Sequence, residues 1–398
     1  MTLIIPQAGY SPLAQLHPRL ICVDKLPLRN PIPTPRTRRH ASSSSAPPQS
    51  QSQPPKKRLW LRLSVLTVAA AAVGAYIRSY EDASGTVLNP VTFTRYKLVS
   101  KQPTSSTISI FHLEPTNPGC GENKIYEEAW QKGIWSVQFK QPQLQIGRDY
   151  TPLPPPPGSA GENIEEDGSL RFLIRRDPRG EVSGYIHSLG EGSTLEIRGP
   201  QTECELPSDI EDVLFIAGGT GIAPAFQAAE TMFRRRKSGR KPRMHILWAN
   251  RRKEDCAGGI SDLATSSKQA RSWWSRLSGF YKSEPVAPPP TSVEEDNAMV
   301  KELEVLKSEY PGRITVDYFV DEENSFIGKD SILDFTKESR PIPEGEQPGK
   351  KLILISGPEG FVNYFAGPKV WDHGKAVQGP LRGVLQQLHL NGWSIWKL

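Results

Sequence analysis

The spacing of apolar residues divides most of the chain into two stretches with different patterns. In the C-terminal half, apolar runs predict strands near Val213, His245, Thr315 and Leu352. Helical stretches such as 223–235 and 298–310 lie between these strands. Strands that alternate with helices form a parallel sheet, so residues 210–398 are expected to fold as an α/β domain.

The preceding stretch has shorter apolar segments. Segments such as 107–112 and 134–139 have the length and composition of β-strands. This pattern predicts an antiparallel Greek-key β-barrel over residues 91–205. Residues 257–297 interrupt the pattern of the α/β domain with a Ser-rich and charged sequence, and we expect them to be a disordered insert.

The N-terminal region has a third pattern. Residues 63–77 are apolar or small apart from Ser64, Thr67 and Tyr76, whereas a soluble amphipathic helix would carry polar residues at helical spacing. Residues 59–78 reach about the length needed to span a bilayer. The sequence therefore predicts a single transmembrane helix there.

The segment before this helix is basic. From Met1 to Tyr80 the only acidic residue is Asp24, and residues 1–58 are rich in Arg, Ser and Pro. This composition is typical of a disordered mitochondrial targeting leader, with a disordered basic tail as the alternative. The basic residues 56–58 are expected to stay on the matrix side of the inner mitochondrial membrane, which leaves the C-terminal domains facing the intermembrane space.

Composition excludes several other classes of protein. The four cysteines show no C-x-x-C pairing and the seven histidines form no cluster, so neither a metal site nor a disulfide scaffold is indicated. The net charge of +6 comes largely from the N-terminal region, and no nucleic-acid-binding module accompanies it.

The glycine-rich sequence V-L-F-I-A-G-G-T-G-I-A-P (213–224) is the most informative motif. An apolar strand leads into a turn with Gly218, Gly219 and Gly221, and a helix begins near Ile222. Such a turn allows a pyrophosphate to approach the backbone at the positive end of a helix. Glycines at these positions also serve close packing alone, so the turn by itself leaves both interpretations open.

Three further motifs supply polar or glycine-rich strand ends. In R-D-Y-T-P, Arg148 and Thr151 suit a phosphate and a polar ring edge, and Tyr150 between them can lie against a planar cofactor. The alternative is a surface strand that ends in a proline turn. In R-G-E-V-S-G-Y-I, Gly180 and Ser183 can face a second phosphate.

The last motif, K-L-I-L-I-S-G-P-E-G, is a buried-looking strand that ends at Ser356 and is followed by glycines. Ligands of open α/β sheets bind at the carboxyl ends of the strands. We therefore expect this turn and the Gly218 turn to face one crevice.

In this order the motifs resemble the ferredoxin-reductase superfamily, and within it the NADH-cytochrome b5 reductase branch, over residues 96–398. The resemblance implies a two-domain flavoprotein, with an FAD-binding barrel over 91–205 and an NAD(P)-binding α/β domain over 210–398. It implies that FAD is bound by Arg148, Tyr150, Thr151, Gly180, Val182 and Ser183. It implies that NADH or NADPH is bound by Gly218, Gly219, Thr220, Gly221, Pro224, Gly357, Pro358 and Glu359.

The same resemblance assigns catalytic positions to Tyr150 on the flavin ring, Thr151 near its reactive edge, Thr220 near the nicotinamide, and Ser356. Two residues depart from the family's pattern: Ser356 stands where a cysteine is usual, and Arg179 replaces a glycine of the FAD loop. Trp393 and Trp396 lie where the family places an aromatic residue beside the flavin.

The choice between NADH and NADPH stays open. After the strand near His245 come Arg251 and Arg252, which favour a 2′-phosphate, and Glu254 and Asp255, which favour a ribose hydroxyl. The alternative, which these residues alone favour over either nucleotide, is a solvated charged turn. The family resemblance favours NADH.

The leader, the membrane segment and the reductase motifs together resemble the inner-membrane flavoproteins of fungi that act in cytochrome c import. This resemblance implies a haem or haem-protein acceptor, with cytochrome c haem lyase and apocytochrome c as partners. The alternatives are a general mitochondrial NADH-cytochrome b5 reductase, and a flavin-bound assembly partner of the lyase that does not turn over.

Overall fold

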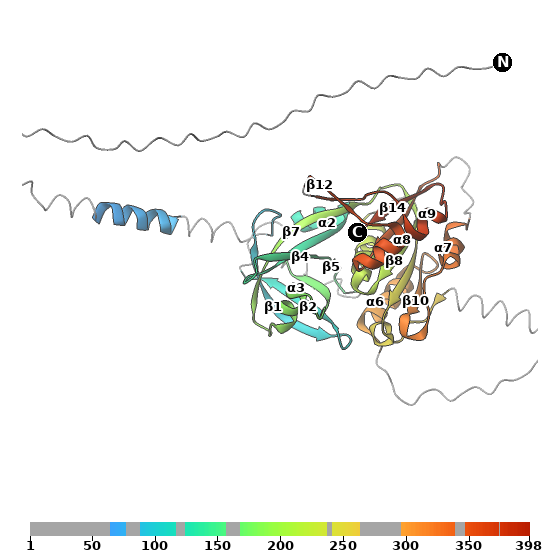
Figure 1. Ribbon diagram of the computed structural model, residues 1–398, viewed down its shortest axis with the longest axis horizontal. Helices are drawn as coiled ribbons and strands as arrows, with labels where there is room; N and C mark the ends of the chain where they lie inside the picture. The colour runs from blue at the N-terminus through green and yellow to red at the C-terminus, as the bar shows by residue number, and fades with distance from the viewer. Residues whose placement is uncertain are drawn as a thin grey trace, which may run out of the picture. The chain divides into compact units, whose positions relative to one another are not determined.

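The computed structural model describes residues 64–76, 88–116, 124–156, 168–236, 241–262, 296–338, 347–373 and 375–398. Residues 66–398 form one compact unit that contains two main sheets (Figure 1). The first sheet is antiparallel and the second is parallel.

The antiparallel sheet has seven strands in the order β4-β3-β7-β1-β2-β6-β5. Their bounds are β1 (Thr94–Pro103), β2 (Ile108–Pro115), β3 (Gly133–Gln141), β4 (Ile146–Tyr150), β5 (Pro152–Leu153), β6 (Leu170–Arg175) and β7 (Thr194–Glu205). In β1 buried and exposed side chains alternate, as expected for a strand with one face toward a core. That core includes Leu98, Phe111, Val137, Phe172 and Ile197, all at most 1% exposed.

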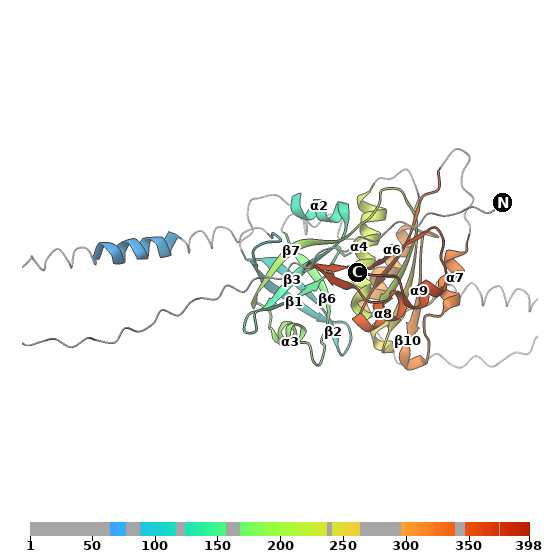
Figure 2. The same ribbon diagram turned by 45° about the horizontal axis from the view of Figure 1, so that its top comes forward.

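The connection between β4 and β5 requires this sheet to curl. These strands lie at opposite ends of the strand order, yet only Thr151 separates them in sequence. Seven flat strands would place the two edges roughly 29 Å apart at about 4.8 Å per strand, whereas neighbouring Cα atoms are about 3.8 Å apart. The sheet therefore bends until its edges meet at Thr151. Helices α2 (Lys124–Lys132) and α3 (Glu181–Ser188) lie at opposite ends of the curled sheet, as Figure 2 shows.

The parallel sheet has five strands in the order β10-β9-β8-β11-β14. They are β8 (Ile210–Gly218), β9 (Arg243–Asn250), β10 (Ile314–Val320), β11 (Lys350–Ser356) and β14 (Trp393–Lys397). In β8 seven successive residues from Asp212 to Gly218 are buried, as expected for a strand covered on both faces. The strands and helices predicted for this half are confirmed.

Helices cover both faces of the parallel sheet. They are α4 (Ala223–Ala229), α6 (Ala298–Glu309), α7 (Lys329–Thr336), α8 (Glu359–Ala366) and α9 (Gly383–Gln387). Alternate β8 residues show the division: Phe215 packs in one core with α4 and α6, and Leu214 packs in another with α7, α8 and α9. Short 3₁₀ helices follow other elements: η1 (Gly219–Ile222), η3 (Lys253–Cys256) and η4 (Asp321–Glu323). The π-helix η2 (Glu230–Arg235) continues α4, and β12 (Val370–Asp372) and β13 (Lys375–Val377) form a hairpin.

Buried hydrogen bonds join the two sheets through α4. The Gln227 side chain is fully buried, accepts a hydrogen bond from the Trp135 amide at 2.9 Å and donates one to the Pro152 carbonyl at 3.0 Å. Thr231, in η2 directly after α4, donates to the carbonyl of Trp130 in α2 at 2.9 Å. An apolar core also runs across this junction, from Ile134 to Phe226. These contacts fix one half of the unit against the other.

Two expectations change in the structure. The described strands form a curled antiparallel sheet, and no hydrogen-bonded pairing between β4 and β5 closes it into the predicted barrel. The bounds 257–297 of the insert were too wide, because Ala257 is buried and Asn297 caps α6 by accepting from the Met299 amide at 2.9 Å. Residues 263–295 lie outside the described residues.

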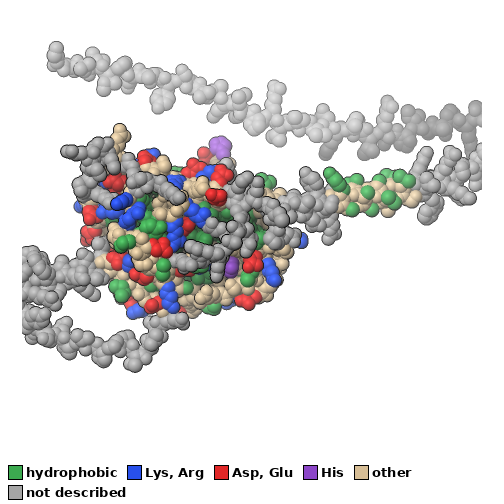
Figure 3. Space-filling model, turned by 180° about the vertical axis from the view of Figure 1, so that it is seen from behind, with side chains coloured by type: hydrophobic (Ala, Val, Ile, Leu, Met, Phe, Trp, Pro, Cys, Tyr) green, Lys and Arg blue, Asp and Glu red, His purple; other side chains and the backbone are tan. Residues whose placement is uncertain are grey.

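The predicted leader, 1–58, also lies outside the described residues, as do 59–63 and 77–78 at the ends of the predicted membrane segment. Residues 64–76 form a helix with exposed apolar side chains, including Leu66 and Val73 (Figure 3). Among the described residues, none of the helices combines the length and apolar character needed to cross a bilayer.

Candidate functional site

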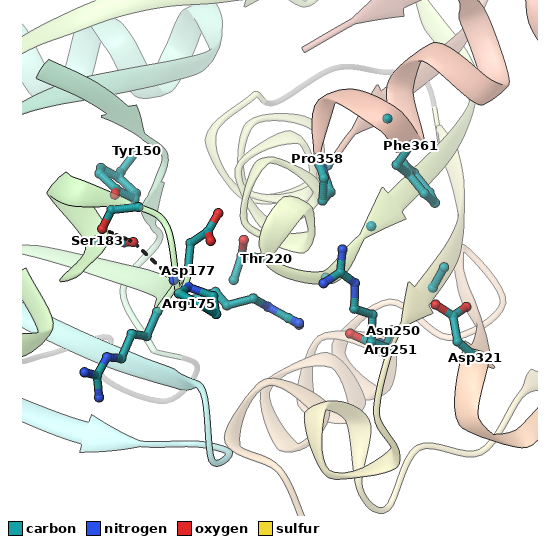
Figure 4. Close-up of a pocket in the computed structure, with 18 of the residues that line it drawn as sticks. Tyr150, Arg175, Asp177, Ser183, Thr220, Asn250, Arg251, Asp321, Pro358 and Phe361 are labelled. Atoms are coloured by element: carbon teal, nitrogen blue, oxygen red, sulfur yellow. Dashed lines mark hydrogen bonds between the residues drawn. The ribbon is translucent and has the colours of Figure 1, made fainter.

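A cleft of about 990 Å³ opens between the antiparallel sheet and the carboxyl ends of the parallel strands. Each of the four sequence motifs contributes residues to the lining of this cleft. Figure 4 shows one residue from each, Tyr150, Ser183, Thr220 and Pro358, arranged around it. The predicted residues that line it are Arg148, Tyr150, Gly180, Val182, Ser183, Gly218, Gly219, Thr220, Gly357 and Pro358. The expectation that the two glycine turns of the parallel sheet face one crevice is therefore confirmed.

The other predicted residues lie behind this surface. Gly221 and Pro224 are buried, Pro224 in the first turn of α4. Ser356, at the end of β11, is 8% exposed. Thr151 lies in the link between β4 and β5, and Glu359 begins α8. None of these five residues lines the cleft.

Two glycines of the 218–221 turn are needed for packing within the protein. A Cβ atom on Gly221 would lie 2.4 Å from the Ser356 carbonyl oxygen and 2.8 Å from the Gly357 nitrogen. A Cβ atom on Gly218 would lie 3.0 Å from the Phe361 ring. The turn after β8 and the turn after β11 thus touch through their backbones, which brings both sets of backbone groups to one edge of the sheet.

Gly219 has a different role because its φ is +55°, a conformation that side chains disfavour. Its carbonyl accepts a hydrogen bond from the Trp248 indole at 2.9 Å, and Trp248 is buried in β9. A neighbouring strand therefore holds the turn in place. Thr220, which follows, keeps its position in the cleft wall.

Tyr150 forms part of the opposite wall at the end of β4. Its ring packs edge-to-face on the buried Phe139 at 5.1 Å. Burial raises the pKa of the Tyr150 hydroxyl to about 12, with Arg148 lowering it and Asp177 raising it by smaller amounts. The ring is therefore neutral at physiological pH and presents a fixed aromatic surface to the cleft.

The loop before α3 supplies a third wall. The Ser183 hydroxyl accepts a hydrogen bond from the Asp177 amide at 3.2 Å and donates one to the Gly180 carbonyl at 3.3 Å. A Cβ atom on Gly180 would lie 2.4 Å from the Ser183 hydroxyl oxygen. Within the described part of the chain, no side chain caps the start of α3 at Gly180. Arg179 is exposed and does not line the cleft, so its replacement of a glycine is accommodated.

Sequence reasoning missed Arg175, at the end of β6. Its guanidinium enters the cleft beside Gly219 and forms an ion pair with the buried Asp255 carboxylate at 2.7 Å. The partners are 80 residues apart in the sequence, and no local motif marks either one. Trp393 and Trp396 do not line the cleft: Trp393 packs beside Phe335, and Trp396 donates to the Glu203 carbonyl at 3.1 Å.

Comparison with known proteins agrees with this arrangement. The Oxidoreductase FAD-binding domain family matches residues 134–206, which include the Arg148 and Gly180 motifs. The Oxidoreductase NAD-binding domain family matches residues 215–277, which include the Gly218 turn.

Three curated proteins illustrate the relationship. An uncharacterized FAD-binding protein of Schizosaccharomyces pombe is 25% identical over 83% of this chain and 94% of its own length. The cytochrome c mitochondrial import factor CYC2 of Saccharomyces cerevisiae is 32% identical over 38% of this chain and 45% of its own length. NADH-cytochrome b5 reductase 2 of Phaeosphaeria nodorum is 25% identical over 66% of this chain and 63% of its own length.

The chain is homologous to the NADH-cytochrome b5 reductases and to CYC2. It is an oxidoreductase of the cytochrome b5 reductase type, with an FAD-binding and an NAD-binding domain. The alignments with CYC2 and with the Phaeosphaeria nodorum reductase cover less than two thirds of those proteins.

The residues present fit these cofactors. The cleft volume of about 990 Å³ lies at the upper end of the roughly 300–1,000 Å³ typical of ligand pockets. The uncapped start of α3 and the Gly219 turn provide backbone N–H groups, and Arg148, Arg175, Arg176 and Arg251 provide positive charge. Tyr150 provides a flat apolar surface.

Proposed function

We propose that this protein uses NAD(P)H and FAD to reduce a haem acceptor, and that it acts on haem destined for cytochrome c. The observation that carries the proposal is a cleft shared by both halves, in which Tyr150 from the FAD-binding half faces the turns at Thr220 and Pro358 from the NAD-binding half. FAD supplies the conversion of a hydride donor into one-electron transfers to an acceptor.

The chain's own residues act by binding and orientation. Tyr150 supports one face of a flavin ring, and Arg148 with the Gly180–Ser183 loop holds the FAD phosphates. The Gly218–Thr220 and Gly357–Pro358 turns would hold the pyridine nucleotide, which supplies the hydride. Positioning two rings in contact and excluding water between them accounts for much of the rate of such a transfer.

This function is tested on the purified full chain. We expect a yellow protein with about one FAD per chain, and bleaching of the flavin absorbance when NADH or NADPH is added without oxygen. Haem, cytochrome b5 and ferricyanide are then compared as acceptors. A colourless protein that takes up no added FAD would contradict the proposal.

A second candidate function is that of a flavin-bound assembly partner of cytochrome c haem lyase with no turnover of its own. Ser356 favours it, because a serine stands where the family usually has a cysteine and its side chain lies outside the cleft surface. Yellow colour without bleaching by either nucleotide would select this function. Restored bleaching in the Ser356→Cys variant would show that the serine is responsible.

The connection to cytochrome c rests on the similarity to CYC2. We propose that the acceptor is haem, reduced before haem lyase attaches it to apocytochrome c, rather than cytochrome b5. Cells that lack the protein should then accumulate apocytochrome c and keep normal cytochrome b5 reduction. The reverse result would select the general reductase.

We further propose attachment to the inner mitochondrial membrane through the region around helix 64–76. Its exposed apolar side chains, such as Leu66, Val68 and Val73, support this assignment. Extraction of mitochondria with alkaline carbonate should leave the protein in the membrane pellet. Protease added to mitoplasts should digest the two catalytic domains.

A further inference from the structure

The carboxyl end of β9 carries cationic and acidic residues whose sequence leaves the choice of nucleotide open. In the structure these residues face different surroundings. Arg251 lines the cleft, whereas Arg252, Glu254 and Asp255 do not.

The two acids are turned toward the antiparallel sheet. Glu254 accepts hydrogen bonds from the Ser106 amide at 3.1 Å, from the Ser106 hydroxyl, and from Arg252 at 3.0 Å. Asp255 is buried, and it accepts from the Ser105 hydroxyl at 2.7 Å and from Arg175 at 2.7 Å. Both carboxylates are therefore used in joining the β1–β2 turn to η3, and neither faces a ribose in the cleft.

Arg251 has a different environment. It forms no ion pair with any acid among the residues that the structure describes. Figure 4 shows its guanidinium extending into the cleft toward the Pro358 turn. A cation in this position can accept a phosphate group as a partner.

Asn250, directly before Arg251, supplies an independent sign of a ligand. It lines the same cleft and is only 3% exposed, yet neither its amide nitrogen nor its amide oxygen makes a hydrogen bond within the described residues. The Cys256 thiol lies beside this amide: burial raises the pKa of the thiol to about 11, and its contact with Asn250 lowers it. A thiol is only a weak hydrogen-bonding partner for an amide. Buried amides normally have partners, so a polar ligand at this strand end would satisfy it.

Four acids line the cleft: Asp149, Asp177 and Glu181 belong to the antiparallel half, and Asp321 lies on the side of the parallel sheet. Asp321 is therefore the alternative residue to bind a ribose hydroxyl. It follows β10, which lies outside β9 in the strand order. A nucleotide that starts at the Gly218 turn, after β8, reaches the end of β9 before it reaches β10. Asn250 and Arg251 are therefore the first polar groups on its path.

We propose that the cleft is built for NADPH, with Arg251 binding the 2′-phosphate of the adenosine ribose and Asn250 contributing an amide hydrogen bond beside it. The inference builds on the proposed function, and it names the donor. It differs from the NADH use that the names of the related reductases indicate.

The test measures binding of nucleotide fragments that carry no nicotinamide. Titration calorimetry on the full chain compares 2′,5′-ADP with 5′-ADP, and stopped-flow flavin reduction compares NADPH with NADH. We expect the wild type to bind 2′,5′-ADP at least about 10-fold more tightly than 5′-ADP. Arg251→Gln should lose about 10- to 100-fold of this preference and keep its affinity for 5′-ADP.

Arg252→Gln is the matched control. Arg252 is the next residue, also exposed, and bonded to Ser106 and Glu254 outside the cleft. This variant should keep the wild-type preference. A loss of the preference in both variants would point to general electrostatic attraction and would overturn the proposal.

Two other results would also overturn it. One is equal binding of the two fragments by the wild type. The other is a preference for NADH that the Asp321→Asn variant loses, which would show that Asp321 binds the ribose hydroxyl. Preferential binding of 2′,5′-ADP without flavin reduction would support the nucleotide site and contradict the proposed catalytic function, so the two failures are distinguishable.

Discussion

The Arg175 guanidinium and the Asp255 carboxylate lie 2.7 Å apart across the junction between the two halves of the protein. Asp255 has a fully buried side chain, and Arg175 is 25% exposed on the wall of the cleft. The pair thus links the position of the FAD-binding half to the strand end that we propose for NADPH binding. A change in either partner should affect both stability and the geometry of the cleft.

We predict that Asp255→Asn lowers the free energy of unfolding by about 3 kcal/mol, because it leaves the Arg175 charge without its buried partner. Urea unfolding followed by fluorescence measures this. Glu254→Gln is the matched control, since its carboxylate is partly exposed and surface pairs contribute at most about 1 kcal/mol. Equal losses of unfolding free energy in the two variants would show that the buried ion pair contributes no more to stability than the partly exposed one.

Gly221→Ala should destabilise the protein by about 1–3 kcal/mol and weaken nucleotide binding, because the new methyl group would overlap the backbone of the Ser356–Gly357 turn. Thermal unfolding and 2′,5′-ADP titration measure the two effects. Gly184→Ala, within α3 and with no atom near the added Cβ, should be neutral or slightly stabilising. Unchanged stability in Gly221→Ala would mean that the two turns can separate without cost.

Replacing Asn250 with Leu should separate stability from binding. Loss of a buried amide without partners is expected to stabilise the fold by about 1 kcal/mol, while the affinity for 2′,5′-ADP falls by about 10-fold. Asn250→Asp, of nearly the same size, should weaken binding by charge repulsion. A destabilised Leu variant would show that bound water satisfies the amide in the free protein.

Tyr150 gives a prediction for alkaline pH. Its pKa is raised from 10 to about 12 in the folded protein, so the unfolded chain releases the hydroxyl proton first. The resulting stability is fully present below pH 10 and is lost as the pH rises through about 12. Unfolding between pH 9 and 12 should show a smaller decline for Tyr150→Phe than for the wild type. Tyrosinate absorbance near pH 10 for this residue would contradict the expectation.

Much of the fold follows from the order of apolar segments. The continuous apolar run of β8 and its glycine turn indicated a buried parallel strand, and the structure places Gly218 and Thr220 in the cleft as predicted. Glycine spacing could not separate packing from ligand approach. Both apply within a few residues, since Gly221 packs on Ser356 while Gly219 forms the cleft surface.

Other features depend on contacts between distant segments. Glu254 and Asp255 suggested recognition of a ribose, but sequence spacing does not show which way the short η3 turn presents its side chains. The serines that hold these acids, Ser105 and Ser106, lie about 150 residues earlier in a turn without a motif. Arg175 was missed for the same reason.

The single residue between β4 and β5 also constrains how the protein can vary. Thr151 is the seam of a curled sheet, with Tyr150 on one side of it and Pro152 on the other. An insertion at this position would allow the two edge strands, β4 and β5, to move apart. Tyr150, which forms part of the cleft wall, would move with β4. Selection should therefore tolerate changes of residue type at this seam more readily than changes of its length.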